Sequence, residues 1–246
     1  MRIVFVRHGE PDYENDCLTP LGRVQARAAA ERLREEGIEE ICSSPLGRAA
    51  ETAAAAAEAL KLPVRTLGFM RELRWGSVNG GPIPFGGHPW DLADRMAEEG
   101  WDLTDPGWRG HPYFSGNLVT AEADSVARKT DEWLAGLGYR REGLYYRCVR
   151  PDSRQTTVAL FSHGGSSAAA MAHILNLPFP YACGLFHLEF TGITIIRLDR
   201  NPGSAALPCL ELANDSRHIH GLRCQGAAGR QEPQGRKRRN GLSTSC

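Results

Sequence analysis

The stretch RIVFVRHGE, residues 2–10, sets the pattern that the rest of the chain follows. Its β-branched and aromatic residues 3–6 are typical of a buried strand in a parallel sheet. Arg7 and His8 follow where that strand ends. Any polar residue can end a strand, but a cation beside an imidazole also presents two groups that attract an anion. The stretch therefore raises the hypothesis of an anion site at the end of the first strand.

Strand and helix signals alternate after this opening. Thr19 can cap a helix, Pro20 suits its first position and Gly37 can terminate it. The alternation favours an α/β fold with three layers, α/β/α, around a mostly parallel central sheet. The expected elements are a helix within 19–37, a strand in 38–44, a helix from Ser44-Pro45 to about Leu60, and a strand in 62–66.

Residues 77–155 break the alternation. Residues 76–90, GSVNGGPIPFGGHPW, are rich in glycine and proline and predict a loop, whereas 89–100 and 120–138 look helical. We expect an inserted flap of loops and helices that covers one end of the sheet and shapes a pocket. Its aromatic residues could instead form only a satellite core. Its histidines, His88 and His111, are expected to pack or to contact substrate and not to bind a metal.

The last third returns to the earlier alternation. Residues 156–175 predict a strand, a turn and a helix, and residues 208–215 predict a last strand. Between them the sequence predicts a hairpin that turns at Thr191-Gly192. A catalytic domain is therefore expected over residues 1–220.

Residues 221–246 form a basic tail, because six lysines and arginines stand there against one glutamate. The tail has few large apolar residues, so we expect it to be disordered and solvated. A contact with nucleic acid or a membrane surface is the alternative.

Composition bounds the class of protein. The chain has 246 residues, 41% hydrophobic and 24% charged, which suits one large globular domain. No apolar stretch could span a bilayer, and the first residues lack a signal-peptide pattern. Seven cysteines are scattered without a CxxC pair. We therefore expect reduced thiols, a cytoplasmic location, and neither a metal site nor a cofactor; a homodimer is left open.

Two segments share a histidine-glycine pair directly after a buried strand, IVFVRHGE and VALFSHGG. Because ligand sites in open α/β sheets lie at the carboxyl ends of the strands, His8 and His163 should reach the same edge. Arg48, in the first turn of the second helix, should reach it too, next to the free N–H groups of that helix. Two histidines with Arg7 and Arg48 would make a pocket for an oxyanion, and phosphate suits the guanidinium geometry best.

These motifs carry a family resemblance. RHGE, LTPLGRVQA, SSPLGRAAET and SHGG together resemble the histidine phosphatase superfamily, in its phosphoglycerate mutase-like, RHG-motif branch. The resemblance covers residues 1–76 and 156–220. It implies that His8 is the nucleophile and is transiently phosphorylated, and that Arg7, Arg48 and His163 hold the phosphoryl oxygens.

The same resemblance implies a proton donor and two substrate contacts. Glu72, in RELRWG, stands in the place of the family's proton donor, where burial and a nearby phosphate would raise its pKa. A surface carboxylate is the alternative for Glu72. Asn15 and Thr19 are further candidates for substrate binding. The other candidate acids are Glu10, Glu122 and Asp124.

The sequence thus favours a metal-independent phosphomonoesterase that hydrolyses a small phosphorylated metabolite through a phosphohistidine. A phosphoglycerate-type mutase is the alternative within the same chemistry. A non-catalytic module that binds a phosphorylated ligand is the alternative from another class. A nucleic-acid binder acting through the tail lacks a supporting motif, so neither nucleic acid nor membrane is expected as a partner.

Overall fold

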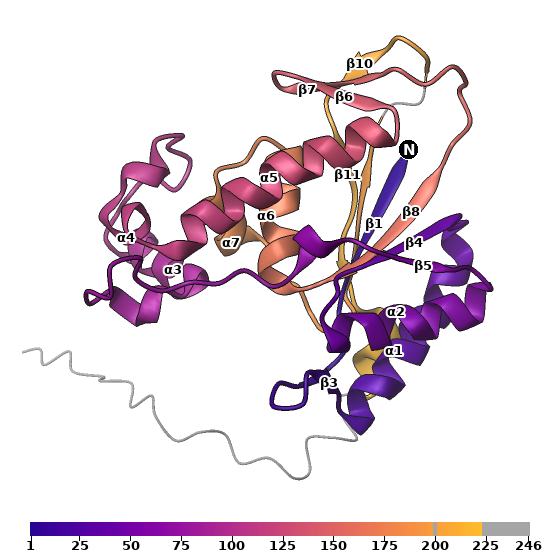
Figure 1. Ribbon diagram of the computed structural model, residues 1–246, viewed down its shortest axis with the longest axis horizontal. Coiled ribbons are helices and arrows are strands. Elements are labelled where there is room, and N and C mark those ends of the chain that lie inside the picture. Colours follow the sequence, from indigo (N-terminus) through magenta and orange to yellow (C-terminus); the bar gives the residue numbers. More distant parts are fainter. Residues whose placement is uncertain (199–200, 223–246) are drawn as a thin grey trace, which may run out of the picture.

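The protein is described here by a computed structural model covering residues 1–198 and 201–222 (Figure 1). The strands are β1 (Arg2–Arg7), β2 (Pro11–Asp12), β3 (Cys17–Leu18), β4 (Glu40–Ser43), β5 (Val64–Thr66), β6 (Tyr139–Glu142), β7 (Tyr145–Cys148), β8 (Thr157–Ser162), β9 (Ile193–Arg197), β10 (Ala205–Ala206) and β11 (Cys209–Asp215). The helices are α1 (Pro20–Leu33), α2 (Gly47–Leu60), α3 (Pro89–Glu98), α4 (Pro112–Ser115), α5 (Leu118–Gly136), α6 (Gly164–Ile174) and α7 (Phe179–Leu185). Short 3-10 turns are η1 (Arg34–Glu36), η2 (Gly68–Met70), η3 (Pro84–Gly87), η4 (Trp108–Gly110) and η5 (Arg217–Ile219).

The central sheet has the strand order β11-β9-β1-β8-β4-β5. The pairs β1–β8, β8–β4 and β4–β5 are parallel. Strand β9 runs antiparallel to both β1 and β11, so it is the reversed strand of an otherwise parallel sheet. The predicted mostly parallel α/β fold is confirmed.

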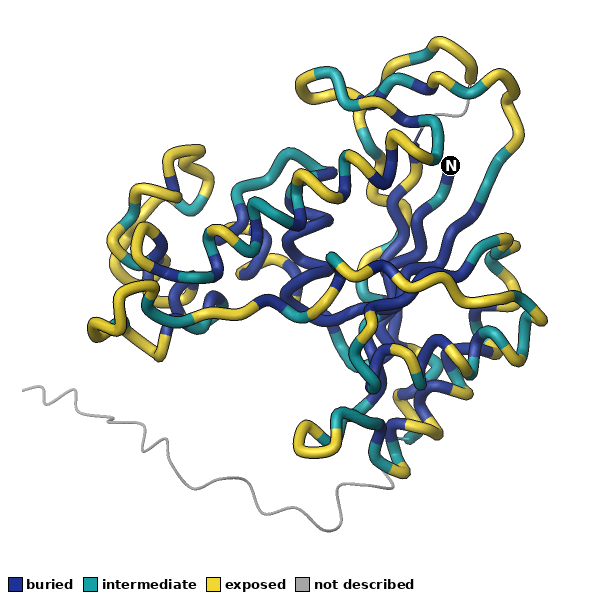
Figure 2. The backbone as a smooth tube through the Cα atoms, viewed as in Figure 1, coloured by how far each residue is buried: buried dark blue, intermediate teal, exposed yellow. Residues whose placement is uncertain are grey.

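Helices cover both faces of this sheet. Alternate residues of β1 point to opposite sides, so Val4 and Val6 join one apolar cluster while Ile3 and Phe5 join another. Helices α1 and α2 cover the first side, and α5, α6 and α7 the second (Figure 1). The four inner strands, β9, β1, β8 and β4, are buried along most of their length (Figure 2). This double cover explains why the strands read as continuous apolar runs.

Helix α1 begins as the sequence predicts, with Thr19 Oγ1 accepting from Gly22 N and Pro20 in the first turn. Helix α2 begins at Gly47, two residues after the predicted Ser44-Pro45 start. Ser44 does not cap it, because the Ser44 hydroxyl is hydrogen-bonded to His163 and to the N–H of Leu46 in the turn before the helix.

The predicted hairpin at Thr191-Gly192 is wrong. Residues 186–190 form no strand. Two of their backbone groups are hydrogen-bonded to the Asn214 side chain instead, whose Oδ1 accepts from Glu189 N and whose Nδ2 donates to the carbonyl of His187. The turn instead leads from this loop into β9, and Thr191 N donates to the carbonyl of Arg7.

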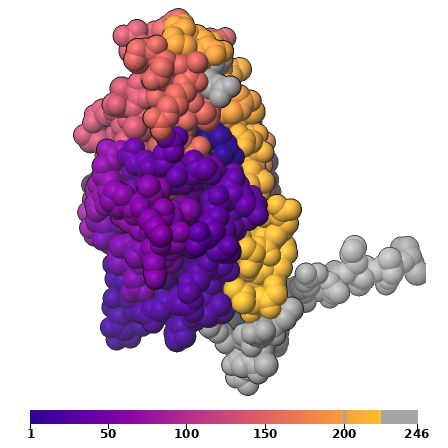
Figure 3. Space-filling model, turned by 90° about the vertical axis from the view of Figure 1, so that its right-hand side faces the viewer, coloured from indigo at the N-terminus to yellow at the C-terminus, as the bar shows by residue number. Residues whose placement is uncertain are grey.

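Residues 77–155 contain the two predicted helices, as α3 and α5, together with a hairpin, β6–β7, that the sequence did not predict. This hairpin pairs with β10 and projects beyond the central sheet (Figure 1). Half of the aromatic residues of the insertion, such as Trp108 and Phe114, are buried in the core, whereas others, such as Phe85 and Trp101, are exposed. In Figure 3 the last of the described residues, in yellow, run along one edge of the molecule, as the terminal place of β11 in the strand order requires.

The predicted tail, residues 221–246, lies outside the described residues apart from its first two. Within residues 1–198 and 201–222, no helix combines the length and the apolar character needed to cross a membrane.

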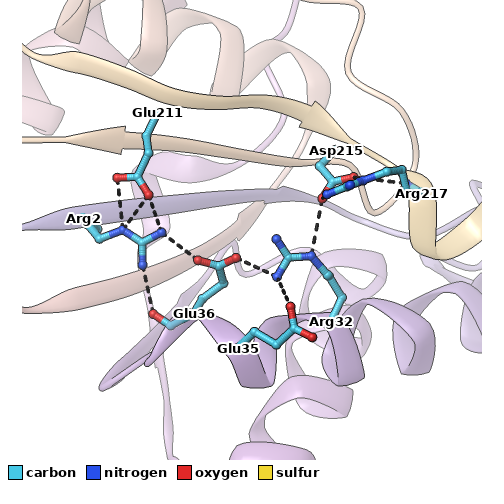
Figure 4. Close-up of polar contacts among 7 residues, drawn as sticks. All are labelled: Arg2, Arg32, Glu35, Glu36, Glu211, Asp215 and Arg217. Atoms are coloured by element: carbon cyan, nitrogen blue, oxygen red, sulfur yellow. Dashed lines mark hydrogen bonds and ion pairs between the residues drawn. The ribbon is translucent and has the colours of Figure 1, made fainter.

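A network of ion pairs ties helix α1 to the edge of the sheet (Figure 4). Glu36 is at its centre, with Arg2 Nη2 at 2.7 Å and Arg32 Nη1 at 2.6 Å from its two carboxylate oxygens. Arg2 also bonds Glu211 of β11, and Arg32 also bonds Asp215. Burial opposes ionisation of Glu36, but the hydrogen bonds from the two arginines outweigh it and lower the pKa of this carboxyl.

We expect Glu36→Gln to reduce the free energy of unfolding by about 1–2 kcal/mol at pH 7, because both arginines lose a charged partner in a half-buried place. The effect should be measured by urea denaturation. Because the folded-state pKa of Glu36 is lowered, its contribution is present above the ordinary carboxyl range and is lost as the pH falls through the folded-state value. The difference in stability between wild type and variant should therefore shrink as the pH falls below the ordinary carboxyl range.

The exposed pair of Glu31 with Arg34 provides the control, and Glu31→Gln should change the free energy of unfolding by less than about 0.5 kcal/mol. Equal effects of the two variants would contradict the proposed role of the network.

Candidate active site

The parallel pairing of β1 with β8 brings the two histidines together. Arg7 lies opposite Ser162 in the register, so His8 and His163 both follow at the same sheet edge. Their ring centroids are 5.1 Å apart, and both side chains are buried. Arg48 reaches the same place from the first turn of α2, with its Nε 3.3 Å from His8 Nε2. The sequence-predicted group of two histidines and two arginines is therefore assembled at one point.

The His8 imidazole is held as a nucleophile requires. Its Nδ1 lies 2.7 Å from the carbonyl of Gly9, and because a carbonyl only accepts, the ring proton must be on Nδ1. The lone pair of Nε2 then faces Arg48. Burial, reinforced by the charges of Arg7 and Arg48, lowers the pKa of His8 to about 3. The ring is thus neutral, with Nε2 unprotonated, at any ordinary pH.

His163 is held by a serine that the sequence analysis assigned only to a helix start. Ser44 Oγ lies 2.8 Å from His163 Nε2 and accepts from the N–H of Leu46, so its own proton is available to the ring nitrogen. We assign the His163 proton to Nδ1, which is buried without a partner among the described residues, so that Ser44 donates to Nε2. Burial, reinforced by the positive charges of Arg48 and Arg7, lowers the pKa of His163 to about 2. This ring is a neutral hydrogen-bond donor.

Arg7 is fixed by the loop before β9. Its Nη1 donates to the carbonyl of Leu188 at 2.5 Å, and its guanidinium lies over the ring of Phe190, 4.4 Å from the centroid. Phe190 also packs against His8, with 5.8 Å between centroids. The Nε of Arg7 is buried and has no partner among the residues that the structure describes. It is a second donor held ready beside His8.

Arg48 has a partner that the sequence analysis missed, the carboxylate of Asp16. Asp16 Oδ1 is 2.6 Å from Arg48 Nη1, and its Oδ2 accepts from the N–H of Gly47 at the start of α2. Burial opposes ionisation of Asp16, but these bonds outweigh it and lower its pKa. Gly47 is required, because a Cβ there would lie 2.0 Å from the carbonyl oxygen of Asp16. The one sequence signal for this contact was Gly47, because a glycine directly before Arg48 indicates that another backbone segment approaches closely there.

Glu72 lies at the N-terminus of α6, which His163 caps. Its Oε1 accepts from the backbone N–H groups of Leu73, Gly165 and Ser166 at 3.0–3.2 Å. Burial nevertheless raises the pKa of Glu72. Since the three bonds end on Oε1, the proton of the acid form belongs on Oε2. A carboxyl with a raised pKa, fixed beside the histidine pair, is suited to proton transfer.

The other sequence candidates lie elsewhere or have other roles. Asn15 is exposed and its amide donates to Asp12, so the structure does not bring it to the site; its neighbour Asp16 is there instead. Thr19 caps α1 and donates to Glu10. Glu122 and Asp124 form ion pairs with Arg74 and Arg109 on the surface.

A pocket of about 370 Å³ opens beside Arg7 and Glu72. One wall is the loop that Asn214 clamps, with His187, Leu188 and Glu189. The opposite wall is aromatic and includes Trp75 and two residues of the predicted flap, His88 and Trp90. No group of three or more His, Cys, Asp or Glu side chains in the described part of the chain is arranged to hold a metal ion.

Known proteins resemble the chain in sequence and in fold. Residues 3–113 match the histidine phosphatase superfamily (branch 1). A probable phosphoglycerate mutase GpmB of Yersinia enterocolitica is 26% identical over 228 residues, which is 89% of this chain and 95% of the relative. The chain belongs to the histidine phosphatase superfamily.

Two solved structures resemble the chain over most of its length. One, titled mycobacterial hydrolase 2, is 30% identical, with a TM-score of 0.60 and coverage of 87% of this chain and 90% of that one. The other is a mycobacterial glucosyl-3-phosphoglycerate phosphatase with inorganic phosphate, 28% identical, with a TM-score of 0.59 and coverage of 89% and 99%.

We expect the site to bind inorganic phosphate, and Arg48→Ala to raise the dissociation constant at least about 30-fold, measured by titration calorimetry. Without the guanidinium, the Asp16 carboxylate would face the anion uncompensated. The matched control is Arg65→Ala, since Arg65 is an exposed arginine of β5 that pairs with Glu40. Phosphate affinity that is unchanged in Arg48→Ala would show that the anion binds elsewhere.

Proposed function

We propose that the protein is a phosphomonoesterase that acts on a small phosphorylated metabolite through a phosphohistidine at His8, without a metal ion. One observation carries the proposal. Two buried donors with no described protein partner, Arg7 Nε and His163 Nδ1, stand beside the unprotonated Nε2 of a neutral His8. Buried polar groups are normally paired, so donors left unpaired beside a nucleophile support a site built for an oxyanion.

In the first step His8 Nε2 attacks phosphorus, and the bond from phosphorus to the ester oxygen breaks as the new bond forms. Negative charge on the equatorial oxygens is stabilised by Arg7, Arg48 and the Nδ1–H of His163. Glu72 gives its proton to the departing oxygen, which leaves as an alcohol. The bond from His8 Nδ1–H to Gly9 stabilises the positive charge that the ring acquires.

In the second step water attacks the phosphohistidine. The Glu72 carboxylate takes a proton from the water, the bond from nitrogen to phosphorus breaks, and inorganic phosphate leaves. His8 is again neutral and Glu72 is again protonated, so the cycle closes. A raised pKa suits Glu72 to both tasks, because it is an acid in one step and a base in the next.

A second candidate, a phosphoglycerate-type mutase, is supported by the name of the Yersinia relative. It would use the same phosphohistidine but return the phosphoryl group to a substrate hydroxyl. The two are separated by incubating the protein with 3-phosphoglycerate and scoring released phosphate against 2-phosphoglycerate. Of the two reactions, we favour hydrolysis.

We also propose a cytoplasmic location, which is supported by the free cysteines of the described residues.

We expect His8→Ala to lose at least about 10⁴-fold in turnover of p-nitrophenyl phosphate, because the variant lacks the unprotonated ring nitrogen that faces Arg48. Rapid quenching of the wild type with ³²P-labelled substrate should yield a protein-bound label that is stable to base and labile to acid, and the variant should yield none. The control His111→Ala removes a histidine of the insertion that caps α4, and it should keep full turnover. Turnover retained in His8→Ala would remove His8 as the nucleophile.

Sensitivity of the wild type to chelators would overturn the metal-free mechanism. Phosphate binding without any turnover would leave a phospholigand-binding module.

We expect Glu72→Gln to reduce kcat/KM for an alkyl phosphate by about 10²–10⁴-fold, and for p-nitrophenyl phosphate by much less, because nitrophenolate leaves without a proton. For the wild type acting on the alkyl ester, kcat/KM should fall as the pH rises through the raised pKa of Glu72, since the acid form is then lost. That alkaline limb should be absent from the variant. Glu122→Gln, at an exposed carboxylate paired with Arg74, is the control. Equal losses on both esters would assign Glu72 a structural role.

A further inference from the structure

We propose that the preferred leaving group carries a ring and no second negative charge, an inference that rests on the proposed function and deepens it. The walls of the pocket beside the phosphate-binding residues support this specificity. They offer flat aromatic faces where the leaving group must lie, and apart from Arg7 their described residues include no arginine or lysine to receive a second anion.

The aromatic wall begins at the reacting centre. Trp90 lies against the start of α6, so that a Cβ added to Gly164 would be 3.6 Å from its ring. His88 follows, 5.3 Å from Trp90 between centroids, and Trp75 follows His88 at 5.1 Å. The three side chains thus form a continuous row that leads outward from His163.

The row is held in place by contacts of its own. His88 Nδ1 is 2.8 Å from the carboxylate of Asp91, which fixes the ring between its two neighbours. Trp75 at the outer end is 38% exposed, so it presents its surface to the pocket without being part of the core. Exposed aromatic side chains in a row are suited to packing against a planar or cyclic group.

The charges in the pocket disfavour an acidic leaving group. Besides Arg7, which the phosphoryl group engages, the described lining residues include no arginine or lysine, and Glu189 adds a carboxyl group. Arg74 is near in sequence but is paired with Glu122. A substrate such as phosphoglycerate would therefore bring its carboxylate against a wall whose described residues offer it no arginine or lysine.

The test uses three alkyl phosphates whose leaving groups differ in ring and charge. Benzyl phosphate has a neutral ring, propyl phosphate is neutral without a ring, and 3-phosphoglycerate carries a second anion. For the wild type we expect kcat/KM to be highest for benzyl phosphate and lowest for 3-phosphoglycerate, with at least tenfold between these extremes. This comparison needs no variant and is unaffected by folding defects.

Trp75→Ala should lower kcat/KM about tenfold for benzyl phosphate and leave propyl phosphate within twofold, and Trp75→Phe should restore most of the loss. The control is Trp101→Ala, because Trp101 is also exposed but packs against His111 outside the pocket. Trp101→Ala should change neither substrate.

Three outcomes would overturn the inference, and a fourth would overturn the proposed function. Equal rates on all three esters, provided that they depend on His8, would remove the specificity and leave the proposed function standing. A preference for 3-phosphoglycerate that Arg71→Ala abolishes would show that the exposed Arg71 anchors a second anion. A higher rate on phosphocholine than on benzyl phosphate would assign the aromatic wall to a cation. Absence of hydrolysis of every ester would instead overturn the proposed function itself.

Discussion

The parallel pairing of β1 with β8 is the constraint on which the site depends. It fixes Arg7 opposite Ser162, and the chain places a histidine directly after each of these residues. The N–H of His8 donates to the carbonyl of Ser162, which extends the strand pairing by one step. A slip of one residue in this register would turn the side chains of β1 to the opposite faces of the sheet. The two apolar clusters that hold β1 from both sides therefore also fix the distance between the two imidazoles.

Burial then decides what the assembled groups can do. His8 and His163 are buried, and two guanidinium groups stand close by, so both rings stay neutral. His8 presents the lone pair of Nε2, because its Nδ1 donates to Gly9. His163 presents the proton of Nδ1, because its Nε2 accepts from Ser44. Such a site needs little reorganisation during the reaction, because its dipoles and charges already point to the place where the phosphoryl oxygens develop charge.

The sequence was sufficient for those parts of the fold and site that follow from local rules. Strand ends, the Thr19 cap and the histidine-glycine pairs predicted the sheet edge where His8, His163 and Arg48 meet. It was insufficient where a side chain replaces a backbone partner, as Asn214 does at residues 187 and 189. It also failed at Asn15, because a tight loop in which Asp16 adopts a positive φ turns the Asp16 carboxylate inward and the Asn15 amide outward. Such exchanges between adjacent polar residues leave no periodicity to detect.

Asp16 shows how the same residues can serve both the empty and the occupied site. Arg48 donates to Asp16 and to His8 at once, so its charge is compensated and its position is fixed before any anion arrives. An incoming phosphoryl group offers Arg48 more than one oxygen and can replace the long 3.3 Å contact with His8 Nε2, which exposes the lone pair for attack. The bond between Asp16 and the start of α2 can persist through this exchange, because it uses the other carboxylate oxygen. The nucleophile is thus uncovered by the substrate that it attacks, and Arg48 needs no large movement to uncover it.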